Sequence, residues 1–177
     1  MGVIVLYQGP CIEIDGVKYH HHPNGGGLIA ETSDVDFESI VELGSIVSGE
    51  TQIHGKVIIR NNSKVSDASI NGTAIIDSSG ISSGAIISGS PQILNKSSVF
   101  GGGKVSDNAL LDKSSVNSGS WVHGNAQLNN TVASEESEAG GNAKLVRSGL
   151  HEGARVFDGL FYEVRIVKSI SVKTKWL

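Results

Sequence analysis

Residues 74–87, AIIDSSGISSGAII, contain the unit that decides the fold: a small residue and an aliphatic residue two positions apart, repeated every five or six residues. The unit recurs from Ser33 to Val156, and its period is neither that of a helix nor a simple alternation. Residues two apart on a strand share a face, so both members of a pair should point inward. The repeat therefore predicts short strands joined by corners, where the small residue leaves room for the turn.

Taking every third aliphatic residue gives three rows, one for each side of a triangular coil of 16 to 18 residues. Row one is Val35, Ile53, Ile70, Ile87, Val105, Val122, Ala139 and Val156. Row two is Val41, Ile59, Ile76, Ile93, Leu111, Leu128 and Leu145. Row three is Val47, Val65, Ile81, Val99, Val116, Ala133 and Leu150. Nearly all five-residue steps join row two to row three, which predicts one tighter corner and an all-β, single-stranded triangular β-solenoid of about seven coils.

Pieces such as Gly124-Asn125-Ala126-Gln127-Leu128 and Asp107-Asn108-Ala109-Leu110-Leu111 resemble the hexapeptide-repeat, left-handed β-helix superfamily. That superfamily includes acyltransferases and γ-class carbonic anhydrases. The resemblance implies left-handed winding and a three-fold trimer, whereas the spacing by itself shows neither. It is specific for the fold and weak for the activity, because one fold serves many functions.

The chain divides into three predicted segments: an N-terminal β-hairpin cap (1–32), the β-helix (33–156) and C-terminal strands that cap the last coil or dock on a partner (157–177). The turn signal Asp15-Gly16, between two strand-like runs, predicts the hairpin. Another strand-like run is Val3 to Tyr7. We expect these strands to cover the open end of the first coil.

Two other regions need an interpretation of their own. In the tail, period-two alternation predicts that Tyr162, Val164 and Ile166 share one strand face, and that the segment 170–176 forms a second strand. Residues 131–143 form the weakest coil, because Ala133 and Ala139 replace larger aliphatics. We expect this coil to continue with a thin core, the alternative being a functional loop over 134–142.

Composition narrows the class of protein. The net charge is −4, with six acidic and no basic residues in 31–50 and a net +3 in 161–177. No basic stripe follows one face, which argues against nucleic-acid binding. The sequence shows no membrane-spanning segment and no signal peptide, so we expect a chain made in the cytoplasm without a membrane partner. Cys11 is the single cysteine, so no internal disulfide forms.

The outward residues of row two suggest an assembly surface. Four of them are large aliphatics on one outer face, and such a stripe is a liability in water unless it is covered. We predict an oligomer interface, most simply of a homotrimer, formed by Ile40, Ile58, Ile75, Gln92, Leu110 and Gln127. The alternative is that the aliphatics are tolerated singly for their β-propensity.

Histidines are the main candidates for chemistry. His20-His21-His22 could form a metal site, since His20 and His22 would share a strand face and three copies in a trimer could meet near an axis. The interpretation that we favour is that they are polar residues of the cap and surface. In the repeats, His54, His123 and His151 each follow an inward aliphatic, and His54 lies four coils from His123. No nucleophile–base pair, carboxylate dyad or phosphate loop stands out. The sequence therefore predicts no catalytic set, no metal site and no cofactor.

The first functional interpretation is a non-enzymatic trimeric structural or attachment protein. Its Gly/Ser/Asn-rich solenoid resembles those of bacteriophage virion appendages and decoration proteins, with other structural proteins of the particle as partners. The first alternative is an acyltransferase-like enzyme whose site lies between subunits and uses His54 or His123. The second alternative is a protein that binds or sequesters a small ligand in grooves between solenoids.

Overall fold

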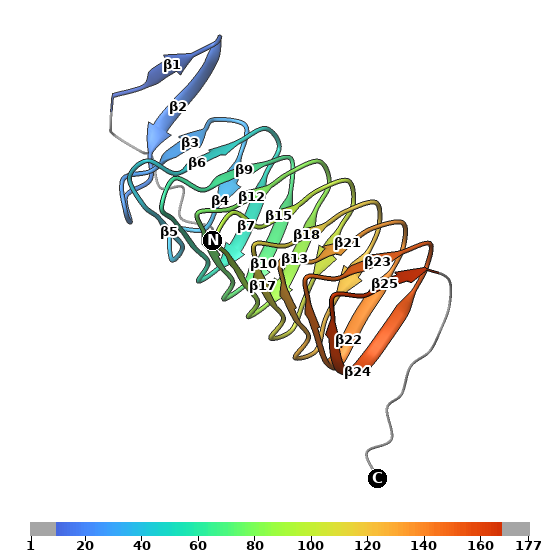
Figure 1. Cartoon of the computed structure of the whole chain (residues 1–177). Coiled ribbons are helices and arrows are strands. Elements are labelled where there is room, and N and C mark those ends of the chain that lie inside the picture. The colour runs from blue at the N-terminus through green and yellow to red at the C-terminus, as the bar shows by residue number, and fades with distance from the viewer. Residues whose placement is uncertain (1–9, 168–177) are drawn as a thin grey trace.

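The computed structural model describes residues 10–167, which form a β-solenoid of about eight turns preceded by a hairpin (Figure 1). The prediction of an all-β solenoid is confirmed, although the sequence indicated about seven coils. Parallel strands stack along the axis, so each coil adds one strand to each of three rows. No helix long and apolar enough to cross a membrane occurs within this described range.

The strands follow the three rows. In row one they are β4 (Asp34–Val35), β7 (Gln52–Gly55), β10 (Ser69–Gly72), β13 (Ile86–Gly89), β16 (Lys104–Val105) and β19 (Trp121–Val122). In row two they are β5 (Ile40–Val41), β8 (Ile58–Arg60), β11 (Ile75–Asp77), β14 (Gln92–Leu94), β17 (Leu110–Asp112) and β20 (Gln127–Asn129). Two long strands, β22 (Glu138–Val146) and β24 (Arg155–Tyr162), run through both rows and join them into one 14-stranded sheet.

Row three belongs to a second, 11-stranded sheet that also includes the N-terminal hairpin. Its parallel strands are β3 (Leu28–Ala30), β6 (Ile46–Ser48), β9 (Lys64–Ser66), β12 (Gly80–Ile81), β15 (Ser98–Val99), β18 (Ser115–Val116), β21 (Val132–Ala133), β23 (Gly149–His151) and β25 (Arg165–Val167). The hairpin strands β1 (Ile12–Ile14) and β2 (Val17–His21) pair antiparallel, and β2 pairs with β3. The hairpin therefore extends one side of the solenoid instead of lying across all three.

The predicted register of all three rows is confirmed. Ile59, Ile76 and Ile93 pair in sequence on row two, and each is 0% exposed. The small residues two positions earlier are also buried, with the exception of the half-buried Ser33 near the first coil. The core is therefore a column of aliphatic side chains. Burial of each of these side chains contributes about 1.5–3 kcal/mol to the folding free energy.

Hydroxyl groups explain why serine and threonine occupy the tight corner between rows two and three. Ser63 Oγ donates to Arg60 O (2.6 Å) and accepts from the Ser79 N–H of the next coil (3.1 Å). The same step recurs where the Thr131 N–H donates to Ser114 Oγ (3.1 Å). A buried hydroxyl is costly unless it is hydrogen-bonded, so these bonds let polar residues line the interior and tie successive coils together.

Glycines shape the corner between rows one and two in the first half of the solenoid. Gly55, Gly72 and Gly89 pair in register, with φ of 99°, 113° and 80°. A Cβ added to Gly72 would lie 2.3 Å from the backbone oxygen of Gly89. These positions need glycine both for the positive φ and for the close approach of neighbouring coils.

The two ends confirm one expectation and correct another. Asp15 and Gly16 have φ of 51° and 78°, as expected for the predicted hairpin turn. The prediction that Tyr162, Val164 and Ile166 share one strand face is wrong, because Ile166 packs against the core whereas the other two are exposed. A corner between β24 and β25 interrupts the alternation there. The predicted strands at Val3–Tyr7 and 170–176 lie outside the described residues.

Residues 131–143 continue the solenoid, as expected. Ala133 and Ala139 are 0% exposed and pair in register with Leu150 and Val156 of the next coil. β22 then carries a β-bulge between Ala139 and Asn142, so the chain bends there without leaving the coil. No loop leaves the solenoid over 134–142.

Candidate functional site

The six predicted interface residues lie in one line along the outer face of row two. Their backbones pair in the order Ile40, Ile58, Ile75, Gln92, Leu110 and Gln127. In the single chain the four aliphatic residues are half-buried, whereas the two glutamines are exposed. The line is thus most apolar over its first three coils, and its role in assembly stays a prediction.

A polar ladder follows this line on the side of the tight corner. Asp77 accepts from Arg60 Nε (2.8 Å), Asn61 Nδ2 (2.8 Å) and Ser78 Oγ (3.0 Å). Two coils further on, Asp112 accepts from Asn95 and Asn129. An apolar strip with a polar rim is the usual anatomy of a protein–protein interface.

The ionised form of Asp77 is favoured in the folded chain. The hydrogen bond from Asn61 is the largest cause that lowers the pKa of Asp77 below its ordinary value of 3.8, and Arg60 and Ser78 act in the same direction. Because the folded pKa lies below the unfolded one, this stabilisation is complete above the unfolded pKa and is lost as pH falls through the folded pKa.

We therefore expect Asp77→Asn to lower the midpoint of thermal unfolding at pH 7. As the pH falls from 4.5 to 2, the unfolding free energy of this variant should decrease less steeply than that of the unmodified chain, and the difference in slope should be about the contribution of one carboxyl group. Unfolding followed by circular dichroism across this pH range measures the slope. Asp67→Asn is a control that also removes one corner carboxylate. An unchanged slope for Asp77→Asn would contradict the role assigned to Asp77.

The three histidines of the repeats do not form a common site. His54 Nδ1 lies 3.4 Å from Asp36 Oδ1, and His123 Nε2 lies 3.0 Å from Glu138 Oε1, both along row one. His151 is on row three, where its Nδ1 lies 2.7 Å from Ser134 Oγ. Each imidazole is thus held by a neighbour from an adjacent coil, and the structure brings no two of them together.

The Ser134–His151 pair was not found by sequence reasoning. The two residues are 17 positions apart, but each directly follows a row-three residue, so the register could have revealed them. Ser134 is 9% exposed, and His151 takes part in none of the five salt bridges within residues 10–167. Ser134 has a base beside it, but the serine is buried and no carboxylate within the described range orients the imidazole of His151. The pair therefore lacks the parts of a nucleophilic triad.

The environment of His123 was also missed. Its ring stacks on Trp121 with centroids 4.0 Å apart and meets the edge of Phe157 at 6.3 Å. A Cβ at residue 140 would lie 2.5 Å from the imidazole, so Gly140 makes the space that this ring fills. Glu138 also lies 3.5 Å from Arg155 Nε, and the result is a fixed aromatic and charged cluster on the outer face of row one.

The histidines of the cap have local partners. His21 Nδ1 lies 2.7 Å from Gly26 O, and His22 Nδ1 lies 3.1 Å from Asn24 O. Burial lowers the pKa of His20, which disfavours its charged form. Among the residues described, no group of three or more His, Cys, Asp or Glu side chains is placed to hold a metal ion.

Comparison with known proteins gives no relative for this chain: no family model, no curated protein and no solved structure matches it.

Proposed function

We propose that this chain is a non-enzymatic structural or attachment module that assembles as a homotrimer through the outer face of row two. The line from Ile40 to Leu110 carries the proposal, because four aliphatic side chains on one flat face are expected to be covered. The left-handed winding and three-fold assembly of the hexapeptide-repeat superfamily belong to the same proposal. So does a place among other structural proteins of a larger particle, such as a bacteriophage virion.

The form of the solenoid supports a structural role. Residues that pair in successive coils are 16 to 18 positions apart along all three rows, so no coil carries an inserted loop. Enzymes usually bind substrates in concave pockets that several elements close. An even rod with flat sides is better suited to side-by-side packing than to enclosing a substrate.

The proposal predicts a mass three times the 18.5 kDa of one chain. Replacing Ile58 and Ile75 together by lysine should give monomers or aggregates, because paired cations cannot be buried in an apolar interface without a large cost. Light scattering after size-exclusion chromatography measures the mass.

Ile86→Lys is the matched control, because Ile86 also points outward but lies on row one and is 46% exposed. Its mass should equal that of the unmodified chain. An unchanged mass for the double variant would contradict the interface. Copurification with a larger particle would support attachment.

One observation favours a second candidate, an acyltransferase-like enzyme. Glu138 contacts His123 at 3.0 Å, as an orienting carboxylate does for a general base. An enzyme of this kind should bind an acyl-coenzyme A and lose its activity in His123→Ala. Calorimetric titration with acetyl-coenzyme A tests it, and absence of binding would leave the structural role.

A further inference from the structure

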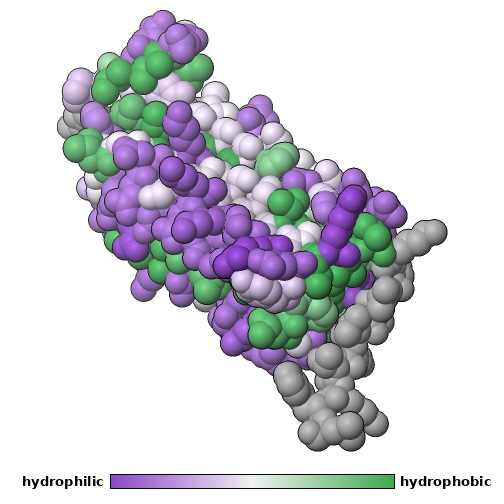
Figure 2. Space-filling view, viewed as in Figure 1, coloured by the Kyte–Doolittle hydropathy of each residue, from purple (hydrophilic) through white to green (hydrophobic). Residues whose placement is uncertain are grey.

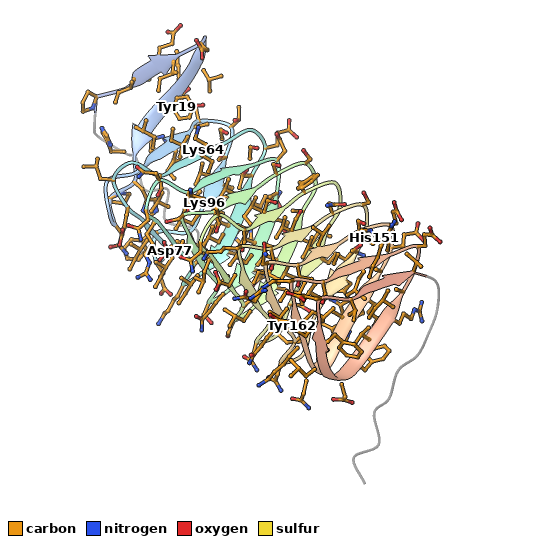
Figure 3. All side chains as sticks on the ribbon, in the orientation of Figure 1. Tyr19, Lys64, Asp77, Lys96, His151 and Tyr162 are labelled. Atoms are coloured by element: carbon orange, nitrogen blue, oxygen red, sulfur yellow. The ribbon has the colours of Figure 1, made fainter. Side chains whose placement is uncertain are left out.

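A hollow lined by lysines lies where the tight corner meets the outer face of row three. Ser78, Asn95, Lys96 and Lys113 line a space of about 540 Å³. An adjoining space of about 330 Å³ shares Ser78 and Lys96 and also borders Lys64 and Gly80. Figure 3 shows Lys64 and Lys96 on the same side of the rod, and in Figure 2 this side is mostly neutral to hydrophilic.

The lysines bring positive charge that the chain itself neutralises only in part. Lys64, Lys96 and Lys113 come from three different coils, and no lysine takes part in a salt bridge in the part of the chain that the structure describes. Of the nearby carboxylates, Asp77 is paired with Arg60, whereas Asp112 accepts from two neutral asparagines and keeps its negative charge. The three lysines exceed that single charge by two. The hollow is thus locally basic in a chain whose net charge is −4.

The walls of the hollow are held in place by the solenoid. Lys96 has a φ of 68°, and its N–H donates to Ser78 O of the preceding coil at 2.8 Å. The Asn95 amide is fixed by its bond to Asp112 at 2.9 Å. On the floor, a Cβ added to Gly80 would meet nothing within 4 Å. The hollow is open and is bordered by exposed cationic side chains, which favour an anionic ligand.

We propose that this hollow binds a compact polyanion, a small molecule with two or more phosphate, sulfate or carboxylate groups. Successive coils are about 4.8 Å apart, so the three ammonium groups are spread along the axis and several anionic groups are needed to reach them together. Lysine acts as a point charge and does not select the planar shape that arginine does. The space is within the size range of small-molecule sites. The lining residues lie on the tight corner and on row three, and none of them is among the row-two residues of the proposed interface.

Tripolyphosphate and orthophosphate are suitable probes in isothermal titration calorimetry. Tripolyphosphate should bind more tightly, and its affinity should fall as ionic strength rises, because exposed charges are screened. Lys96→Gln with Lys113→Gln should weaken tripolyphosphate binding by about tenfold or more. Gly80→Trp should weaken it as well, because position 80 has open space for a Cβ and the indole would project into the hollow.

Lys56→Gln with Lys104→Gln is the control. Both lysines are exposed and lie on other sides of the rod, and the two substitutions remove the same amount of charge. This pair should retain most of the affinity. An equal loss in the control pair, or no binding by the unmodified chain, would overturn the proposal. The proposal would also be overturned if the unmodified chain bound no anion and the replacement of Lys96 and Lys113 changed the oligomeric mass. The lysines would then serve assembly.

Discussion

Gly72→Ala is expected to destabilise the solenoid by about 3 kcal/mol or more. The methyl group would meet the backbone oxygen of Gly89 at 2.3 Å, and a backbone atom cannot move aside as a flexible side chain can. The φ of 113° adds strain, because residues with a Cβ rarely adopt that conformation. Since Gly55 and Gly89 repeat the geometry in the neighbouring coils, a shift at Gly72 would be passed on to both.

Gly80→Ala is the matched control for this prediction. Gly80 lies in the same coil, but its Cβ would point into open space and its φ is not positive. Alanine there should be neutral or stabilise by a few tenths of a kcal/mol, because it restricts the unfolded chain. Urea unfolding of both variants measures the difference. Equal stabilities would show that the corner between rows one and two tolerates a side chain.

Ile87→Ala is expected to cost about 2–5 kcal/mol of unfolding free energy. Ile87 is 1% exposed and lies between Ile70 and Val105 in row one, so its removal leaves a cavity that the neighbouring coils cannot fill. The rigid stacking of strands above and below limits any collapse around the cavity.

The adjacent Ile86 provides the control, because the same substitution there removes the same atoms from the outer face. Ile86 is 46% exposed, and Ile86→Ala should cost less than about 1 kcal/mol. Thermal and urea unfolding of the two variants give the comparison. Similar losses at both positions would contradict the inward direction of row one.

Much of the fold was predictable because the repeat states its register many times. Each aliphatic residue marks one inward position, and the three rows follow from spacing alone. The first and last turns were harder for physical reasons. Gly27-Leu28-Ile29 fits the unit, but it directly follows Pro23-Asn24-Gly25-Gly26, whose composition is typical of a loop. Ile29 is in fact 1% exposed and pairs with Val47. At the other end, Ile166 is an inward residue, but Val164 occupies the position two residues earlier where the repeat unit has a small residue. The last corner was therefore not indicated by the sequence pattern.

The contacts outside the core could not be predicted in the same way. Ser134 meets His151 because outward residues of neighbouring coils come into register. Trp121 stacks on His123, two residues further along the same coil, only because both side chains adopt particular rotamers. Spacing fixes which residues are neighbours but not which way a long side chain turns. The outer line from Ile40 to Gln127 was predictable because it depends only on which residues are neighbours. The lysine hollow also depends on which groups form hydrogen bonds with Asp77 and Asp112.

The hydroxyl ladder at the tight corner has a consequence for how such a chain can evolve. Five of these side chains each accept a hydrogen bond from a backbone N–H of the coil that follows, namely Ser63, Ser97, Ser114, Thr131 and Ser148. Their coils therefore offer the next coil the same acceptor at the same place. Duplication or loss of one of these coils would therefore leave the junctions on either side with the same hydrogen bonds. The length of the rod can change in steps of about 4.8 Å, whereas a one-residue insertion on a strand would turn its inward residues outward.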